Sequence, residues 1–138
     1  MADLIYNDFL DELHQGNIDL NSDTFVLILL ADTYTPDATD HDLADVSANE
    51  VANGSGYTTG GQSLTVSYDE TSGTVTFDAD DLVWNSATFT ARYALIYDDT
   101  HAEDLLAFLL DFSENKTGQG DTFTVRFNAS GIYVGAQA

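Results

Sequence analysis

The stretch at residues 75–97, VTFDADDLVWNSATFTARYALIY, contains the longest strict alternation in the chain. A period of two places successive side chains on opposite faces of a β-strand. The second face turns from polar to apolar at Ala94 and Ile96, which indicates a strand that begins half-exposed and ends buried on both sides. We predict that residues 87–97 form the central strand of a β-sandwich. One face carries Phe89, Ala91, Tyr93, Leu95 and Tyr97, and the other carries Thr88, Thr90, Arg92, Ala94 and Ile96.

Further strand patterns lie on both sides of this segment. Residues 24–30, TFVLILL, form a continuous apolar run that is typical of a strand buried on both faces. Residues 64–68 and 75–77 alternate around a hairpin loop at 69–73. Residues 105–112 fit a buried strand, with a short helix as the alternative. Strands are also expected at 122–127 and 132–134.

Only one clear helix is expected. Leu4, Ile5, Phe9, Leu10 and Leu13 recur at helical spacing, and Gly16 stands where a left-handed cap belongs, so residues 3–14 predict an amphipathic helix. Residues 34–61 predict mostly a long loop, with a helical turn or short strand near Leu43, Val46 and Val51. The fold class is therefore mainly β: a single domain over 1–138 that combines this N-terminal α-helix with an antiparallel, jelly-roll-like β-sandwich over about 24–134.

The charge balance restricts the partners. The chain has 24 acidic residues and only 3 basic ones, Arg92, Lys116 and Arg126, for a formal net charge of −21. Binding to nucleic acid requires Lys and Arg, so neither nucleic acid nor an anionic membrane surface is an expected partner. Such a charge repels itself at low ionic strength, and about 1 M salt screens most of that repulsion. The near-absence of lysine predicts a protein from a halophile.

Other features bear on compartment and chemistry. The chain has no cysteine, so it can form neither disulfides nor thiolate metal sites. Its N-terminal segment lacks the basic and apolar regions of a signal peptide, so we expect synthesis in the cytoplasm. No nucleophile elbow or phosphate loop is present. We expect no enzymatic activity and no catalytic residue.

Acidic clusters provide weak candidates for a structural Ca²⁺ or Mg²⁺ site. Asp78, Asp80 and Asp81 are the strongest of these, because neighbouring strands would hold them in place. None of the clusters matches the twelve-residue calcium loop, and a solvated acidic loop is the simpler interpretation, so no cofactor is expected. The histidines, His14, His41 and His101, lie far apart in sequence, and none has a second histidine at ligand spacing.

Three residues are candidates for an interface. Trp84 and Tyr57 could form an aromatic platform, with core packing as the alternative. Arg92 lies on the polar face of the long strand and must meet carboxylates, either from neighbouring strands or from another subunit.

The order of segments resembles a family of small structural proteins encoded among the head and tail genes of tailed phages and haloarchaeal tailed viruses. The resemblance rests on structural motifs that span nearly the whole chain. They are Leu4-Ile5-Tyr6-Asn7, Tyr34-Thr35-Pro36-Asp37, Asn49-Glu50-Val51, the glycine-rich 54–61, Phe77-Asp78-Ala79-Asp80-Asp81 with Trp84, Thr90-Ala91-Arg92-Tyr93-Ala94 and Thr122-Phe123-Thr124-Val125.

This resemblance implies a non-enzymatic component of a virion, either a capsid decoration or turret (vertex) protein that assembles as a symmetric oligomer, or a neck or tail protein. The implied partners are other copies of the chain and other virion proteins, with host-surface contact as a further possibility. A free-standing β-sandwich module that binds a glycan or a cation is the alternative from another class.

Overall fold

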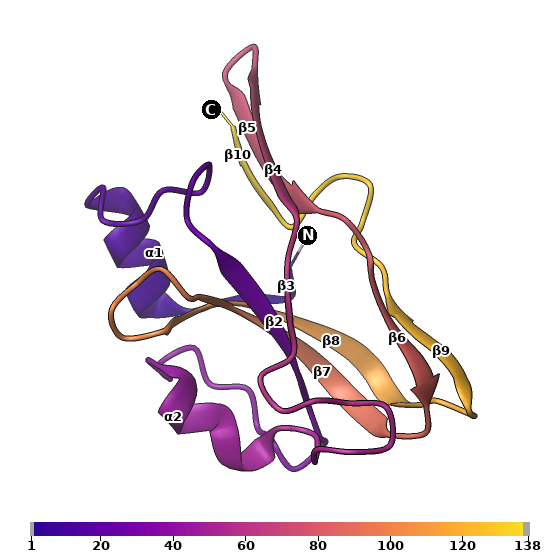
Figure 1. Cartoon of the computed structure of the whole chain (residues 1–138). Coiled ribbons are helices and arrows are strands. Elements are labelled where there is room, and N and C mark those ends of the chain that lie inside the picture. Colours follow the sequence, from indigo (N-terminus) through magenta and orange to yellow (C-terminus); the bar gives the residue numbers. More distant parts are fainter. Residues whose placement is uncertain (1, 137–138) are drawn as a thin grey trace.

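Strand β7 (Thr90–Asp98) is the middle strand of the largest sheet, as the alternation predicted. The computed structural model describes residues 2–136 of the chain. The order in this sheet is β1-β8-β7-β2-β3, and every pair is antiparallel (Figure 1). The other strands of this sheet are β1 (Leu4–Ile5), β8 (Leu105–Thr117), β2 (Phe25–Leu30) and β3 (Gln62–Ser63), and β7 itself pairs with β8 and β2.

The burial of these strands follows their sequence patterns. β7 runs from an exposed Thr90 to a segment that is buried on both faces from Tyr93 to Asp98. β2 is buried at all six positions, which confirms the interpretation of its continuous apolar run. Residues 105–112 belong to strand β8, although their leucines suit a helix as well. Pairing with β7 on one side and β1 on the other decides between the two.

Two smaller antiparallel sheets complete the β structure. One has the order β10-β5-β4, and the other pairs β6 with β9. The chain passes from β5 to β6 at Asp80 and Asp81, where the sequence breaks its strand pattern. The bounds are β4 (Val66–Thr71), β5 (Thr74–Ala79), β6 (Leu82–Ala87), β9 (Asp121–Val125) and β10 (Tyr133–Ala136).

Aromatic rings in one core cluster join the sheets. The Phe77 ring of the three-stranded sheet lies 5.1 Å from that of Phe25 and 5.8 Å from that of Phe108 in the largest sheet, measured between centroids. The Phe89 and Phe123 rings, 4.8 Å apart, join the two-stranded sheet to the start of β7. With 47% of the described residues in strands and 11% in helices, the mainly β prediction is confirmed.

The prediction of a single helix over 3–14 was wrong in two respects. Leu4 and Ile5 form β1 opposite Leu109 and Phe108, so helix α1 begins only at Asn7 and ends at His14. A second helical segment, α2 (Leu43–Val46) continued by the 3₁₀-helix η1 (Ser47–Asn49), lies in the region that we expected to be mostly loop. None of the helices described in residues 2–136 is long and apolar enough to cross a membrane.

Local capping explains α2. The Asp42 carboxylate accepts a hydrogen bond from the backbone N–H of Ala44 at 3.0 Å, and the Asp45 carboxylate accepts one from that of Asp42 at 3.3 Å. This reciprocal arrangement satisfies amide donors that a helix N-terminus leaves free. Val46 then buries its side chain completely.

The hairpin of β4 and β5 projects from the body of the molecule, and we call residues 66–79 the arm (Figure 1). Its strands continue further than expected and leave only Ser72 and Gly73 in the turn. Both have positive φ, at 53° and 81°, as tight hairpin turns require. β4 is the edge strand of its sheet, and its residues 67–71 are all exposed.

Gly61 provides a test of this packing. Its φ is +66°, and a Cβ atom built there would lie 1.9 Å from the carbonyl oxygen of Leu27 in β2. We therefore expect Gly61→Ala to lower the free energy of unfolding by about 2 kcal/mol or more, through overlap with buried backbone added to the cost of its φ. Denaturant unfolding in concentrated salt measures this.

Gly60→Ala is the matched control, because Gly60 also has a positive φ, at +98°, with no atom within 4 Å of the added Cβ. It should lose only the conformational part, on the order of 1 kcal/mol. Equal losses in the two variants would contradict the close approach at Leu27.

Candidate functional site

A groove opens between the second half of β8 and strand β9, and we call it the basic groove. Its volume is about 570 Å³, within the usual range of binding pockets. Phe112, Phe123 and Val125 give it an apolar lining. The remaining lining residues are Lys116, Thr117, Gly118, Gln119, Asp121, Thr122, Thr124 and Arg126.

The groove contains two of the three basic residues of the whole chain. Lys116 Nζ lies 2.5 Å from Glu114 Oε1, so an exposed carboxylate already offsets part of its charge. Arg126 is exposed and forms no ion pair with any residue of the described range 2–136. A guanidinium without an ion-pair partner in that range, in a chain of net charge −21, is available to a negatively charged ligand.

Two strand edges border the groove. β9 pairs only with β6, and β8 pairs with β1 only at Phe108 and Leu109, so the outer edge of residues 112–117 has no neighbouring strand within the described chain. The turn between β8 and β9 is fixed by hydrogen bonds from Gly118 N–H to the Phe89 carbonyl and from Gly120 N–H to the Ala87 carbonyl. The groove is therefore rigid at its closed end and lined by unpaired backbone edges, which favours an extended segment as its ligand.

Arg92, an interface candidate from sequence, is satisfied within the subunit. Its Nε donates to Asp111 Oδ1 at 2.8 Å across the β7–β8 pair. This ion pair with a neighbouring strand was one of the two expected alternatives. It lowers the pKa of Asp111, because the carboxylate accepts charge-assisted hydrogen bonds from the guanidinium.

Tyr57 and Trp84, the other interface candidates, lie in the core. Tyr57 is 2% exposed and Trp84 4%, and their rings stack with centroids 6.2 Å apart. The Tyr57 hydroxyl accepts a hydrogen bond from the backbone N–H of Leu29 at 3.1 Å. The core-packing alternative therefore describes both residues, since a ring enclosed within the subunit presents no surface to a partner.

The candidate metal ligands do not converge. Asp78 Oδ1 accepts from the backbone of Ala79, and Asp81 Oδ1 accepts from the backbone of Phe127. Asp80 is exposed. Among residues 2–136, no three His, Asp or Glu side chains are arranged to hold a metal ion.

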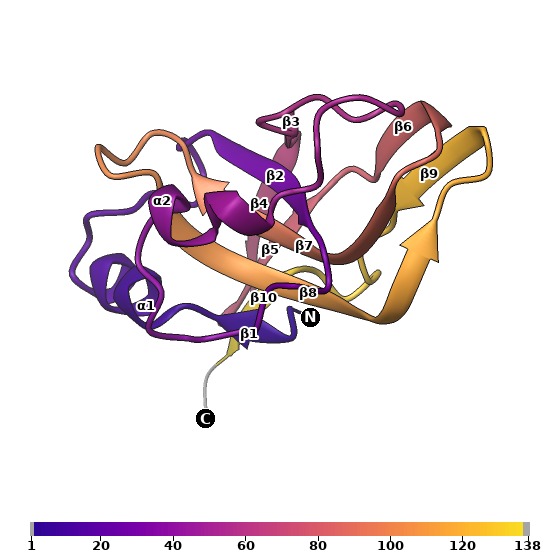
Figure 2. The ribbon, with the colours of Figure 1, turned by 90° about the horizontal axis from the view of Figure 1, so that it is seen from below.

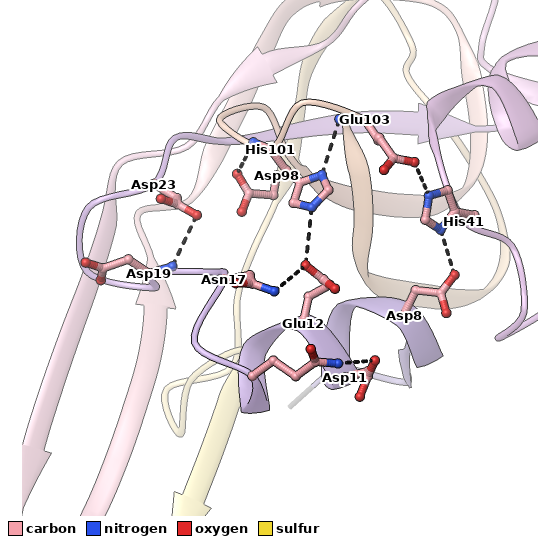
Figure 3. Close-up of polar contacts among 11 residues, drawn as sticks. Asp8, Asp11, Glu12, Asn17, Asp19, Asp23, His41, Asp98, His101 and Glu103 are labelled. Carbon is pink, nitrogen blue, oxygen red and sulfur yellow. Dashed lines mark hydrogen bonds and ion pairs between the residues drawn. The ribbon is translucent and has the colours of Figure 1, made fainter.

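The fold instead gathers two histidines and several acids along one side of α1 (Figure 3). They line a cavity of about 270 Å³. His41 Nδ1 lies 2.6 Å from Asp8 Oδ2, and its Nε2 lies 2.6 Å from Glu103 Oε2. Because carboxylates only accept, both ring nitrogens must donate, and the hydrogen bonds to Glu103 and Asp8 raise the pKa of His41 to about 9. This imidazolium ties α1 to the loop between β7 and β8.

His101 belongs to the same cluster in a different role. Its Nδ1 accepts a hydrogen bond from the backbone N–H of Glu103 at 3.2 Å, which places a ring proton on Nε2, 3.6 Å from Glu12 Oε2. The backbone N–H of His101 donates to Asp98 Oδ1 at 3.2 Å. His14, the third histidine, is exposed at the end of α1.

Asp98 is the one buried charged residue in the described core. It is 0% exposed, and its Oδ1 accepts from the backbone N–H groups of Thr100 and His101. Its Oδ2 has no other hydrogen-bond donor and faces the carboxyl of Asp23 (Figure 3). Burial, and then the hydrogen bond to Asp23, raise the pKa of Asp98 to about 7, so Asp98 keeps its proton at mildly acidic pH and can share it with the Asp23 carboxyl in a hydrogen bond.

Sequence reasoning missed both the groove and the polar cluster. A signal for the groove existed, since Lys116 and Arg126 lie only ten positions apart in a chain with one other basic residue. No local signal announced the cluster, because His41 joins residues 33 and 62 positions away.

Comparison of the chain with protein-family models, with curated proteins and with solved structures finds no match.

Asp98→Asn should reveal the shared proton. Because the folded pKa lies above the ordinary value of 3.8, the native state binds more protons, and the stability that Asp98 contributes is lost as pH rises from about 4 through about 7. At pH 8 the amide can donate to Asp23 without a second buried charge. We expect Asp98→Asn to be more stable than the parent there, on the order of 2 kcal/mol, and to lose that advantage near pH 4.

Urea or thermal unfolding across pH 4–8 at constant high salt measures the difference. Asp99→Asn, a neighbouring exposed position, is the control for the loss of one negative charge. If Asp98→Asn follows the Asp99→Asn curve at every pH, the two carboxyls do not share a proton.

Proposed function

We propose that this protein is a non-enzymatic structural subunit of a tailed virus particle from a halophilic host, built as an antiparallel, jelly-roll-like β-sandwich. It acts at the head, as a decoration or turret protein, and assembles with further copies of itself and with other virion proteins. The arm is the observation that carries this proposal.

Residues 67–71 of β4 are exposed, at the free edge of a sheet that projects from the body. An edge strand left open in this way is a template for pairing, and proteins cover or charge such edges. Here the edge is charged, by Asp69 and Glu70, which discourages unspecific pairing and still permits a partner that offers positive charge. Most residues of β4 are exposed in the single subunit, which favours a role for this strand in contacts between subunits.

The ring contacts among Phe25, Phe77 and Phe108 support the sandwich, since they join a side chain of the three-stranded sheet to side chains of the largest one. The acidic surface supports the halophilic host in this proposal. Concentrated electrolyte reduces the Debye length to about 3 Å at 1 M, so like charges on adjacent subunits can lie close together. The assignment to a virus particle rests on the sequence resemblance.

Purified particles of a virus that encodes this chain provide the direct test. We expect mass spectrometry to find the chain in them, and single-particle imaging to place its copies at symmetry-related positions on the head. Density at the neck or tail would assign it there instead. A chain absent from the particles and found only in host cytoplasm would contradict a structural role in the virion.

The surface charge makes a separate prediction about solvent. Lowering chloride salt from about 2 M to about 0.05 M should reduce the melting temperature or dissociate the assembly, because the screening length grows past about 10 Å. Sucrose at equal osmolarity should not restore stability at low salt, since it leaves the charges unscreened. Equal melting at both salt concentrations would contradict a surface adapted to brine.

A further inference from the structure

We infer that the arm of one copy binds in the basic groove of the next, with Asp69 and Glu70 of the arm against Lys116 and Arg126 of the groove. This inference rests on the proposed assembly and names the two surfaces that form it. Both surfaces belong to this chain: the arm offers exposed carboxylates, and the groove offers two basic side chains.

Charge complementarity selects this pair of surfaces. Of the three basic residues, Arg92 is paired with Asp111, and the other two both line the groove. The acidic edge of the arm can therefore contact Lys or Arg side chains of a second copy that lie in its groove. The arm has three acidic residues, Asp69, Glu70 and Asp78, and no basic one. Contact between two acidic faces would bring carboxylates together, which is costly when they are desolvated.

The shape of the groove fits a hairpin tip. The groove is bordered by the outer edges of β8 residues 112–117 and of β9, which have no strand partner in the described chain. The tip of the arm is two strands wide, and β4 presents its own unpaired edge. Backbone hydrogen bonds between such edges give affinity, while side chains in the lining give specificity. Phe112, which is half-buried, supplies apolar surface that water leaves on binding, while Phe123 and Val125 are buried beneath the groove.

Position rules out docking within one molecule. The arm points away from the body at one end, and the β8–β9 turn lies at the opposite end (Figure 1). The view from below likewise shows β6 and β9 on the side of the molecule away from α1 (Figure 2). Because the two surfaces are different and do not overlap, the contact is heterologous. Repeated around an axis, it closes a ring, which is the symmetry that a turret or decoration ring needs.

Charge reversal tests the contact. The groove variant is Lys116→Glu with Arg126→Glu, and the arm variant is Asp69→Lys with Glu70→Lys. Light scattering after size exclusion, at the lowest salt that keeps the parent folded, measures the oligomer. We expect each variant alone to weaken association on the order of ten-fold or more, and the variant carrying all four changes to recover it.

A mixture of the two variants gives a sharper readout. The groove variant keeps an acidic arm and the arm variant keeps a basic groove, so a mixed pair can form the normal contact. The reversed arm and the reversed groove are complementary as well. We expect the mixture to associate with the two variants alternating, although each variant alone stays dissociated. Asp80→Arg is the matched control: it shifts the charge at another exposed acidic residue and should leave the oligomer unchanged. Melting curves confirm that every variant is folded.

The outcomes separate this inference from the proposed function. A parent chain that stays monomeric at every concentration counts against assembly, and with it the function. A parent that assembles while both charge-reversed variants assemble equally well would leave the function standing and overturn the arm-and-groove contact. If the variant with all four changes does not associate, and the groove and arm variants are both dissociated, the arm is likewise excluded as the occupant of the groove.

Discussion

The structure depends on the complete burial of one strand pair, β2 and the second half of β7, between covered faces. A strand buried on both sides must satisfy every backbone donor and acceptor through its neighbours, because no water is present to replace them. β7 does so by pairing with β2 on one edge and β8 on the other. The largest sheet follows from that requirement, and α1 and the smaller sheets contribute the rings that close the core over it.

The charge of −21 acts against this packing, and the few intramolecular cations lie where they offset it most directly. Arg92 pairs with Asp111 across β7 and β8, and the His41 imidazolium joins Asp8 of α1 to Glu103 of the loop after β7. Asp98, at the buried end of β7, avoids a second charge by sharing a proton with Asp23. Exposed ion pairs contribute little on their own, so these contacts orient α1 and the loops, while burial supplies the stability.

Some side chains find their partners within the subunit and stabilise the fold, whereas others remain without one. Tyr57 and Trp84 were interface candidates from sequence, yet their rings complete the core. Arg126 and the exposed edge of β4 find no equivalent partner within the described chain. We propose that these charged and open surfaces, which complement each other, bind a second copy of the chain.

The sequence by itself determined the strands whose pattern is local: the alternation of β7, the apolar run of β2 and the hairpin at β4 and β5 are all visible in the order of residues. It also determined the acidic character of the protein, because the net charge follows from the composition alone. Only the tertiary structure decided that Leu4 and Ile5 pair with β8 instead of starting a helix, that Phe112 and Phe123 border one groove with Arg126, and that His41 lies between Asp8 and Glu103. These arrangements join residues tens of positions apart, and a one-dimensional pattern carries no information about which distant strands and loops the packing of the core will bring together.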